Sequence, residues 1–190
     1  MFVYEEAWDY NGYLESDLLE YREKQEKIFE KIELKQENIK KIKAIQNTVN
    51  LVVFAEIYCP DCRALVPYIE KIRSLNSKIN VSIFPRKGNE NYLTAHSKEG
   101  KIPTVLMEDL KKGDEIFVPI LEEFPEEIKN EISAFSEKTE KSNLIYEYRT
   151  GHRNNEIENY LVEKISNILL SIFSELFESN NFLALFQRQF

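Results

Sequence analysis

Residues 58–62 read Tyr-Cys-Pro-Asp-Cys and hold both cysteines of the chain, Cys59 and Cys62. The preceding residues 50–57 are mostly apolar and β-branched over the length of a strand, whereas residues 63–75 repeat apolar side chains with the period of a helix. The cysteines are therefore predicted at a turn from a strand into a helix. The positive end of a helix dipole and its free N–H groups stabilise a thiolate, the form of cysteine that attacks disulfides. This placement is typical of a redox-active dithiol.

The composition is that of an ordinary folded protein. The chain has 190 residues, of which 43% are hydrophobic, and this is enough for one domain with a sizeable core. Its formal net charge is −8. Sequence-independent binding of nucleic acid needs a basic surface that replaces counterions on the phosphates. We therefore expect no nucleic-acid partner.

The N-terminus lacks the pattern of an export signal. Glu5, Glu6 and Asp9 occupy positions where a signal peptide carries Lys or Arg before an apolar run. No stretch of the sequence approaches the roughly 18 uninterrupted apolar residues of a membrane span. We expect a cytoplasmic protein with no membrane partner. In a reducing cytoplasm, two cysteines at this spacing are more often catalytic or metal-binding than a structural disulfide.

The rest of the chain alternates between the periods of helices and strands, which predicts an α/β fold with a mixed sheet of four or five strands and helices on both faces. Ser16 is expected to cap the first helix, and Pro67 is expected to kink the helix after the cysteines. The strands on either side of a short turn at 111–114 are expected to pair antiparallel. Helices are expected at 16–32, 36–46, 63–75, 90–96, 126–136 and 155–179, strands at 50–57, 78–84, 104–108 and 115–119, and irregular structure at 143–152.

The predicted organisation is a core with a helical extension at each end. Residues 49–140 form the α/β core, residues 1–48 a helical extension packed on it, and residues 141–190 a second helical extension. Within the second extension, residues 155–179 carry apolar side chains on one broad face. Such a face usually packs on the core of its own chain. The alternative is that it covers a partner, such as a second copy of the chain in a homodimer.

Three features together resemble the thioredoxin superfamily. They are the Cys-Pro-Asp-Cys turn at 59–62, Pro67 in the following helix, and Ile-Pro-Thr at 102–104 where a strand begins. The resemblance implies a thioredoxin-like fold in which Pro103 follows a cis peptide bond and lies beside the cysteine pair. Cis bonds are essentially confined to proline, so the residue type is required there.

A closer similarity is to bacterial thioredoxin-like proteins with a Glu-X-X-Cys-X-Asp-Cys centre, here Glu56 and Asp61 with the two cysteines. It extends from residue 16 to residue 165 and includes three further segments, at 84–86, 123–127 and 148–151.

The chain departs from well-characterised thioredoxins at Val53. The family has a buried aspartate there, which is assigned to proton transfer at the second cysteine. Glu56 is the candidate substitute, because it lies nearer the turn. The alternative is that Glu56 is only a solvated carboxylate at the end of a strand.

The predicted chemistry is dithiol–disulfide exchange. Cys59, nearer the helix start, attacks a substrate disulfide as a thiolate, and Cys62 then attacks the mixed disulfide and releases the reduced substrate. Asp61 complements the helix N-terminus but disfavours a neighbouring thiolate, and Arg63 is expected to offset it. We therefore expect the pKa of Cys59 to lie below that of a free thiol. We expect the Cys-Pro-Asp-Cys turn, which includes Pro60, to reduce disulfides rather than to form them.

Two further residues are candidates for contact with substrate. Tyr58 precedes the first cysteine and is expected in a hydrophobic lip that receives the substrate, as the aromatic residue of the resembling family does. Arg86 follows a strand near the same edge of the sheet, where it either attracts an acidic substrate group or pairs with a carboxylate of the chain.

Two other readings remain open. A zinc site would need four ligands, and the chain adds only His96 and His152, which lack paired spacing. We expect no metal and no cofactor.

The alternative to catalysis is a redox-sensing or non-catalytic adaptor that binds a partner through the groove at Pro103 or the C-terminal helix. For the enzyme, the expected partners are a disulfide-containing protein substrate and a recycling reductase or dithiol.

Overall fold

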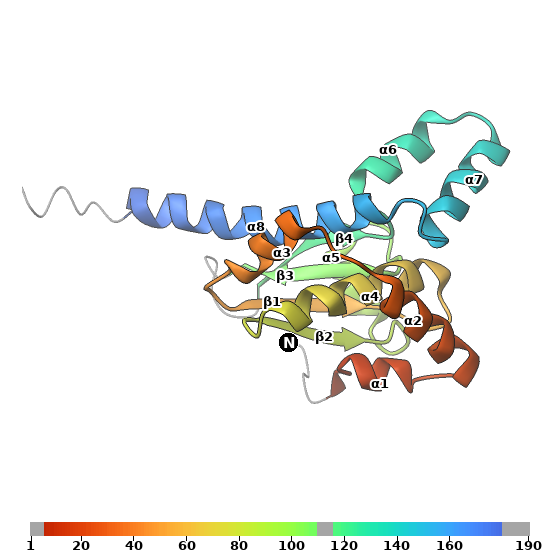
Figure 1. Cartoon of the computed structure of the whole chain (residues 1–190), viewed down its shortest axis with the longest axis horizontal. Helices are drawn as coiled ribbons and strands as arrows, with labels where there is room; N and C mark the ends of the chain where they lie inside the picture. Colours follow the sequence, from red (N-terminus) through yellow and green to blue (C-terminus); the bar gives the residue numbers. More distant parts are fainter. Residues whose placement is uncertain (1–5, 110–115, 180–190) are drawn as a thin grey trace, which may run out of the picture.

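A mixed sheet of four strands lies at the centre of the structure, a computed structural model that describes residues 6–109 and 116–179, with side chains as far as residue 166 (Figure 1). The strands are β1 (Val49–Phe54), β2 (Ile79–Phe84), β3 (Thr104–Glu108) and β4 (Phe117–Glu122). Their order in the sheet is β2-β1-β3-β4. β1 pairs in parallel with β2 and antiparallel with β3, and β3 pairs antiparallel with β4, as predicted for the strands on either side of the 111–114 turn. The predicted turn at 111–114 lies outside the described residues.

Helices cover both faces of this sheet, and the chain has the predicted thioredoxin-like α/β fold. The helix that follows the cysteines, α4, begins at Pro60 and contains the buried Pro67. The described helices are α1 (Tyr10–Leu14), α2 (Leu19–Lys31), α3 (Gln36–Lys43), α4 (Pro60–Leu75), α5 (Glu90–His96), α6 (Glu126–Ala134), α7 (Lys138–Arg149) and α8 (Asn154–Ser179).

Two hydrophobic clusters fill the spaces between the sheet and its helices. Successive side chains of a strand point to opposite faces, so Leu51 and Val53 of β1 join the larger cluster, which α4 and α8 cover. Val52 and Phe54 join the smaller one, which α5 covers with Leu93. β1 is buried on both faces, and this explains why its sequence is an almost continuous apolar run.

The N-terminal residues extend the sheet at its β2 edge. Trp8 and Ile83 exchange backbone hydrogen bonds of 2.8 and 2.9 Å as an isolated antiparallel bridge. The chain then enters α1 and turns into α2. The prediction that Ser16 caps α2 is wrong, because α2 begins at Leu19 and the Ser16 hydroxyl donates to the carbonyl of Tyr13 instead.

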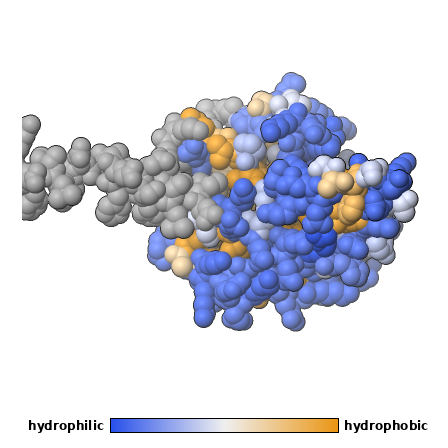
Figure 2. Space-filling model, turned by 90° about the horizontal axis from the view of Figure 1, so that it is seen from above, coloured by the Kyte–Doolittle hydropathy of each residue, from blue (hydrophilic) through white to orange (hydrophobic). Residues whose placement is uncertain are grey.

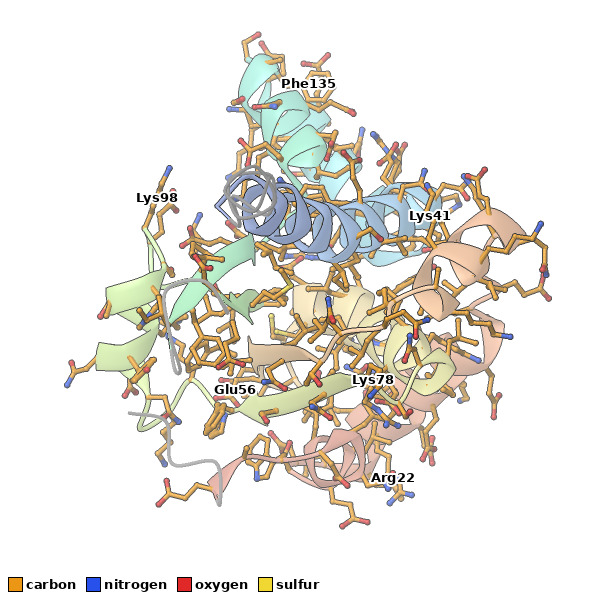
Figure 3. The ribbon with its side chains drawn as sticks, turned by 90° about the vertical axis from the view of Figure 1, so that its left-hand side faces the viewer. Arg22, Lys41, Glu56, Lys78, Lys98 and Phe135 are labelled. Atoms are coloured by element: carbon orange, nitrogen blue, oxygen red, sulfur yellow. The ribbon has the colours of Figure 1, made fainter. Side chains whose placement is uncertain are left out.

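The prediction of irregular structure at 143–152 is wrong, because α7 occupies most of it. Only Leu144 and Tyr148 of this helix are buried, four residues apart on one face. So narrow an apolar stripe is hard to distinguish from a polar loop in the sequence. In Figure 3, Phe135 marks the far end of α6, away from the sheet, from which the chain returns through α7.

The first half of α8 packs on the domain, as the broad apolar face predicted. Ile157, Leu161 and Ile165 are buried in the larger cluster. The buried Glu158 accepts hydrogen bonds from the backbone N–H of Lys35 at 2.7 Å and from Asn38 Nδ2 at 2.8 Å. The predicted boundaries at residues 48 and 140, and the homodimer, stay predictions.

On the face drawn in Figure 2, hydrophobic residues form small patches within a mostly hydrophilic surface. Within the described residues, no helix combines the length and the apolar character needed to cross a bilayer.

Candidate active site

The cysteine turn connects β1 to α4. Cys59 is the N-cap residue of α4 and has an extended backbone, and Pro60 is the first residue of the helix. Proline suits this position because the N–H that it lacks would have no partner within the helix. The Cys59 carbonyl accepts a hydrogen bond of 3.0 Å from the Arg63 N–H, and the Cys59 N–H donates to the Glu56 carbonyl at 3.0 Å. Cys59 therefore lies at the positive end of the α4 dipole.

The two free thiols differ in exposure and in pKa. The hydrogen bond from the Cys62 thiol lowers the pKa of Cys59 most, and the backbone N–H groups of Cys62 and Asp61 lower it further. Partial burial and the Asp61 charge oppose them, and the resulting pKa of Cys59 is about 7. Complete burial raises the pKa of Cys62 well above its usual value, and the Cys59 thiolate adds to the rise. Near neutral pH, Cys59 is therefore partly ionised while Cys62 keeps its proton.

Two fully buried tyrosines lie near the cysteines. The Tyr13 hydroxyl accepts a hydrogen bond of 2.9 Å from Gln25 Nε2, whereas the Tyr148 hydroxyl has no hydrogen-bond partner among the described residues. Burial raises the pKa of both tyrosines well above 10, and the negative charges at the turn add to this effect. Neither tyrosine can act as a base near neutral pH. Val53 is also fully buried, and it leaves an apolar side chain where the resembling family has its aspartate.

The segment before β3 lies beside the thiol of Cys59, which is partly exposed. The peptide bond between Ile102 and Pro103 is cis, as the resemblance implied. The Ile102 carbonyl lies 3.9 Å from Cys59 Sγ, within hydrogen-bond range of a thiol. The Pro103 carbonyl accepts a hydrogen bond of 2.7 Å from the Glu123 N–H, which ties this segment to the end of β4. Backbone groups therefore line the space beside Cys59.

Asp61 is paired with Arg149, the last residue of α7. Arg149 Nε lies 2.7 Å from Oδ1 and Nη2 lies 2.8 Å from Oδ2, so each carboxylate oxygen has its own donor. The Asp61 side chain is 9% exposed and that of Arg149 is 38% exposed. Arg63, the partner that the sequence suggested, donates instead to the Tyr58 carbonyl at 3.4 Å. The cation paired with Asp61 is therefore Arg149 and not the predicted Arg63.

Arg149 is the site residue that the sequence did not identify. It is 88 residues from Asp61, and the expected irregular structure at 143–152 gave no reason to place it near the cysteines. The one available signal was the similarity of residues 148–151 to the thioredoxin-like proteins.

Glu56, labelled in Figure 3, follows β1 and is 9% exposed. Its Oε1 accepts hydrogen bonds from the backbone N–H groups of Arg86 at 2.9 Å and Lys87 at 3.3 Å. The carboxylate therefore fixes the loop after β2, and the alternative of a merely solvated group is wrong. The backbone of Glu56, not its carboxylate, is among the groups that act on the pKa of Cys62. A role for Glu56 as a proton acceptor stays a prediction.

The remaining candidates are Tyr58 and the two histidines. Tyr58 is 50% exposed next to Cys59, and its role as a lip stays a prediction. His96 stacks on Tyr92 with ring centroids 4.7 Å apart, and His152 Nδ1 lies 2.8 Å from the Thr150 hydroxyl. Among residues 6–109 and 116–179, no group of three or more His, Cys, Asp or Glu side chains could hold a metal ion.

Comparisons with known proteins agree with the fold. A family model described as thioredoxin matches residues 7–138. The chain is 16% identical to a protein of unknown function from Pseudomonas aeruginosa, with a TM-score of 0.69, and the match covers 86% of this chain and 95% of that one. It is 17% identical to an HIV epitope-scaffold, with a TM-score of 0.67 and the same two coverages. At these identities the likeness is one of fold. No curated protein matches the sequence.

Proposed function

This chain belongs to the thioredoxin family, and from that premise we propose that it is a thiol–disulfide oxidoreductase that reduces protein disulfides through Cys59 and Cys62. The observation that carries the proposal is the inequality of the two thiols. Cys59 is partly exposed and has a pKa of about 7, whereas Cys62 is fully buried and its pKa is raised. An attacking thiol must be ionised and accessible, and a resolving thiol must stay protected until the mixed disulfide has formed.

The reaction has two exchange steps. The Cys59 thiolate attacks one sulfur of the substrate disulfide, a new S–S bond forms, and the other substrate sulfur leaves as a thiolate that takes up a proton. Cys62 then loses its proton and attacks Cys59 Sγ, which expels the second substrate thiol. The substrate gains two electrons and two protons, and the protein is left with a Cys59–Cys62 disulfide. An external dithiol or a reductase returns those electrons, in keeping with a reducing cytoplasm.

Two features of the surface favour a protein as the substrate. Tyr58 is half exposed and precedes Cys59 in the chain, and the Ile102 carbonyl, before the cis bond to Pro103, lies within 3.9 Å of the thiol. An extended polypeptide carrying a disulfide can contact both, whereas a small disulfide would reach only the sulfur.

The test is reduction of insulin by the purified protein with dithiothreitol in excess. We expect turnover above the dithiothreitol background, and we expect Cys59→Ser to abolish it. Incubated with insulin in the absence of dithiothreitol, reduced Cys62→Ser should instead accumulate a mixed disulfide between Cys59 and insulin, visible as a mass adduct that dithiothreitol then removes. A wild-type rate equal to the background would contradict the proposal, as would full activity in Cys59→Ser.

A second candidate function is the adaptor, which one observation favours. Val53 supplies no carboxylate near Cys62, and the Glu56 carboxylate is bonded to the backbone of Arg86 and Lys87. Deprotonation of Cys62 would then be slow, and a complex docked without a covalent bond would persist without turnover. The two functions separate in Cys59→Ser, which keeps its binding to a captured partner if the protein is an adaptor but loses insulin reduction if it is an enzyme.

A further inference from the structure

We propose that Arg149 is a positioning residue of the active site, which neutralises the Asp61 carboxylate and thereby keeps Cys59 nucleophilic at neutral pH. The inference rests on the proposed function of the cysteine pair. It concerns a residue from α7, which begins where the family match ends, at residue 138.

The first step of the argument is the place of Asp61. This residue lies in the first turn of α4, two residues after Cys59, and its backbone N–H donates to the Cys59 thiolate. Its carboxylate acts in the opposite direction, because a neighbouring negative charge raises the pKa of a thiol. The sequence therefore places an opposing charge beside the nucleophile.

The second step is the geometry of the ion pair. The guanidinium of Arg149 engages both oxygens of Asp61 at 2.7 and 2.8 Å, a fork that lysine cannot reproduce. The same guanidinium interacts electrostatically with Cys59, whose charge helps to raise the pKa of Arg149, after the larger effects of Asp61. The cation is hydrogen-bonded to Asp61 and interacts electrostatically with Cys59, and a positive charge favours the thiolate.

The third step is that Arg149 is fixed in place. Its neighbour Tyr148 is fully buried, with its ring edge-on to that of Phe124 at a centroid distance of 5.0 Å. α7 ends directly after Arg149, where Gly151 adopts a φ of 86° that side-chain-bearing residues disfavour. A cation in the last turn also complements the helix dipole. The backbone at Arg149 is therefore fixed by its buried neighbour and by the helix end, while its guanidinium stays partly exposed.

The test is the pH dependence of Cys59 alkylation by iodoacetamide in the full-length reduced protein, with the modified cysteine identified by mass spectrometry. Arg149→Met removes the charge, and Arg149→Lys keeps the charge but loses the fork. Arg153→Met is the matched control, because Arg153 lies four residues away and pairs with Glu131 and Glu156 instead. Asp61→Asn combined with Arg149→Met removes both charges. Thermal melting of each variant confirms that it is folded.

The expected result is a shift that follows the charge. From a wild-type midpoint of about 7, Arg149→Met should move the midpoint up by roughly one unit, so that alkylation at neutral pH slows roughly fivefold. Arg149→Lys should move it less, and the double variant should return it to the wild-type value or below. Arg153→Met should leave it unchanged.

Two results would overturn the inference. One is a folded Arg149→Met protein with the wild-type midpoint. The other is an equal shift in Arg153→Met, which would show general loosening of the fold. The measurement needs no turnover, so it is separable from the proposed function. Absence of insulin reduction with a shifted midpoint would refute the reductase, and normal reduction with an unshifted midpoint would refute only the role of Arg149.

Discussion

Two carboxylates flank the cysteine turn, and their partners give them different roles. Glu56 precedes Cys59 by three residues and Asp61 follows it by two. They are almost equally buried, with 9% and 7% of the whole residue exposed. Glu56 accepts hydrogen bonds from two backbone N–H groups, which are neutral and leave its charge in place. Asp61 pairs with a guanidinium, whose positive charge opposes its own. The burial of an acidic residue near a nucleophile does not by itself predict whether its role is structural or electrostatic. The group that pairs with its carboxylate determines that role.

The two carboxylates also differ in their relation to Cys59. The main influences on the pKa of Cys59 include the charge of Asp61 but not that of Glu56. Glu56 instead joins the end of β1 to the loop after β2, so its contribution is to the shape of the site. The first two predictions below test whether Glu56 acts on the structure and Asp61 on the electrostatics of Cys59, and the third tests the pKa of Cys59 itself.

The largest expected effect is the loss of stability in Glu56→Ala. This change leaves two partly buried N–H groups without their acceptor, and we expect the free energy of unfolding in urea to fall by about 2–3 kcal/mol. Glu56→Gln keeps a carbonyl acceptor and should lose about 1 kcal/mol. Neither variant should move the midpoint of Cys59 alkylation. A midpoint that moved with Glu56 would remove the distinction between the two carboxylates.

A smaller effect on stability, but a direct one on reactivity, is expected for Asp61→Asn. The exposed fraction of Arg149 limits the value of the ion pair, so the loss should be about 1 kcal/mol. The pKa of Cys59 should fall, because the opposing charge is gone and Arg149 remains. Alkylation rates measured near pH 6 should rise by up to roughly fivefold. An unchanged or slower rate would show that the Asp61 charge does not act on Cys59.

The smallest expected effect is the pH dependence of stability that Cys59 contributes. Its pKa is lowered from 9.0 to about 7 in the folded protein, so the stabilisation is fully present above the unfolded pKa and is lost as the pH falls through the folded one. Because the thiol is partly exposed, we expect the reduced wild type to gain about 1 kcal/mol over Cys59→Ser between about pH 6 and about pH 8.5. Urea unfolding at several pH values measures it. A difference that shrank with rising pH would have the wrong sign.

The position of the two cysteines could be predicted because its determinants are local. A strand of apolar β-branched residues, a helix period and two cysteines between them place the thiols at a helix N-terminus, and the Ile-Pro-Thr segment at 102–104 supplied the resemblance that placed Pro103 beside them. The errors were local as well. Ser16 is a suitable N-cap by residue type, but its hydroxyl donates to the Tyr13 carbonyl instead of capping α2. The apolar stripe of α7 consists of only two buried residues, and this was too little to predict a helix.

The sequence by itself determined the fold class and the reactive pair, since backbone propensity, periodicity and the helix dipole act between near neighbours in the chain. Only the tertiary structure decided which charges surround that pair. Arg149 reaches Asp61 across 88 residues, because Leu144 and Tyr148 of α7 are buried and α7 packs against α4. An ion pair of this kind depends on the docking of two elements, and the sequence near either residue does not contain it.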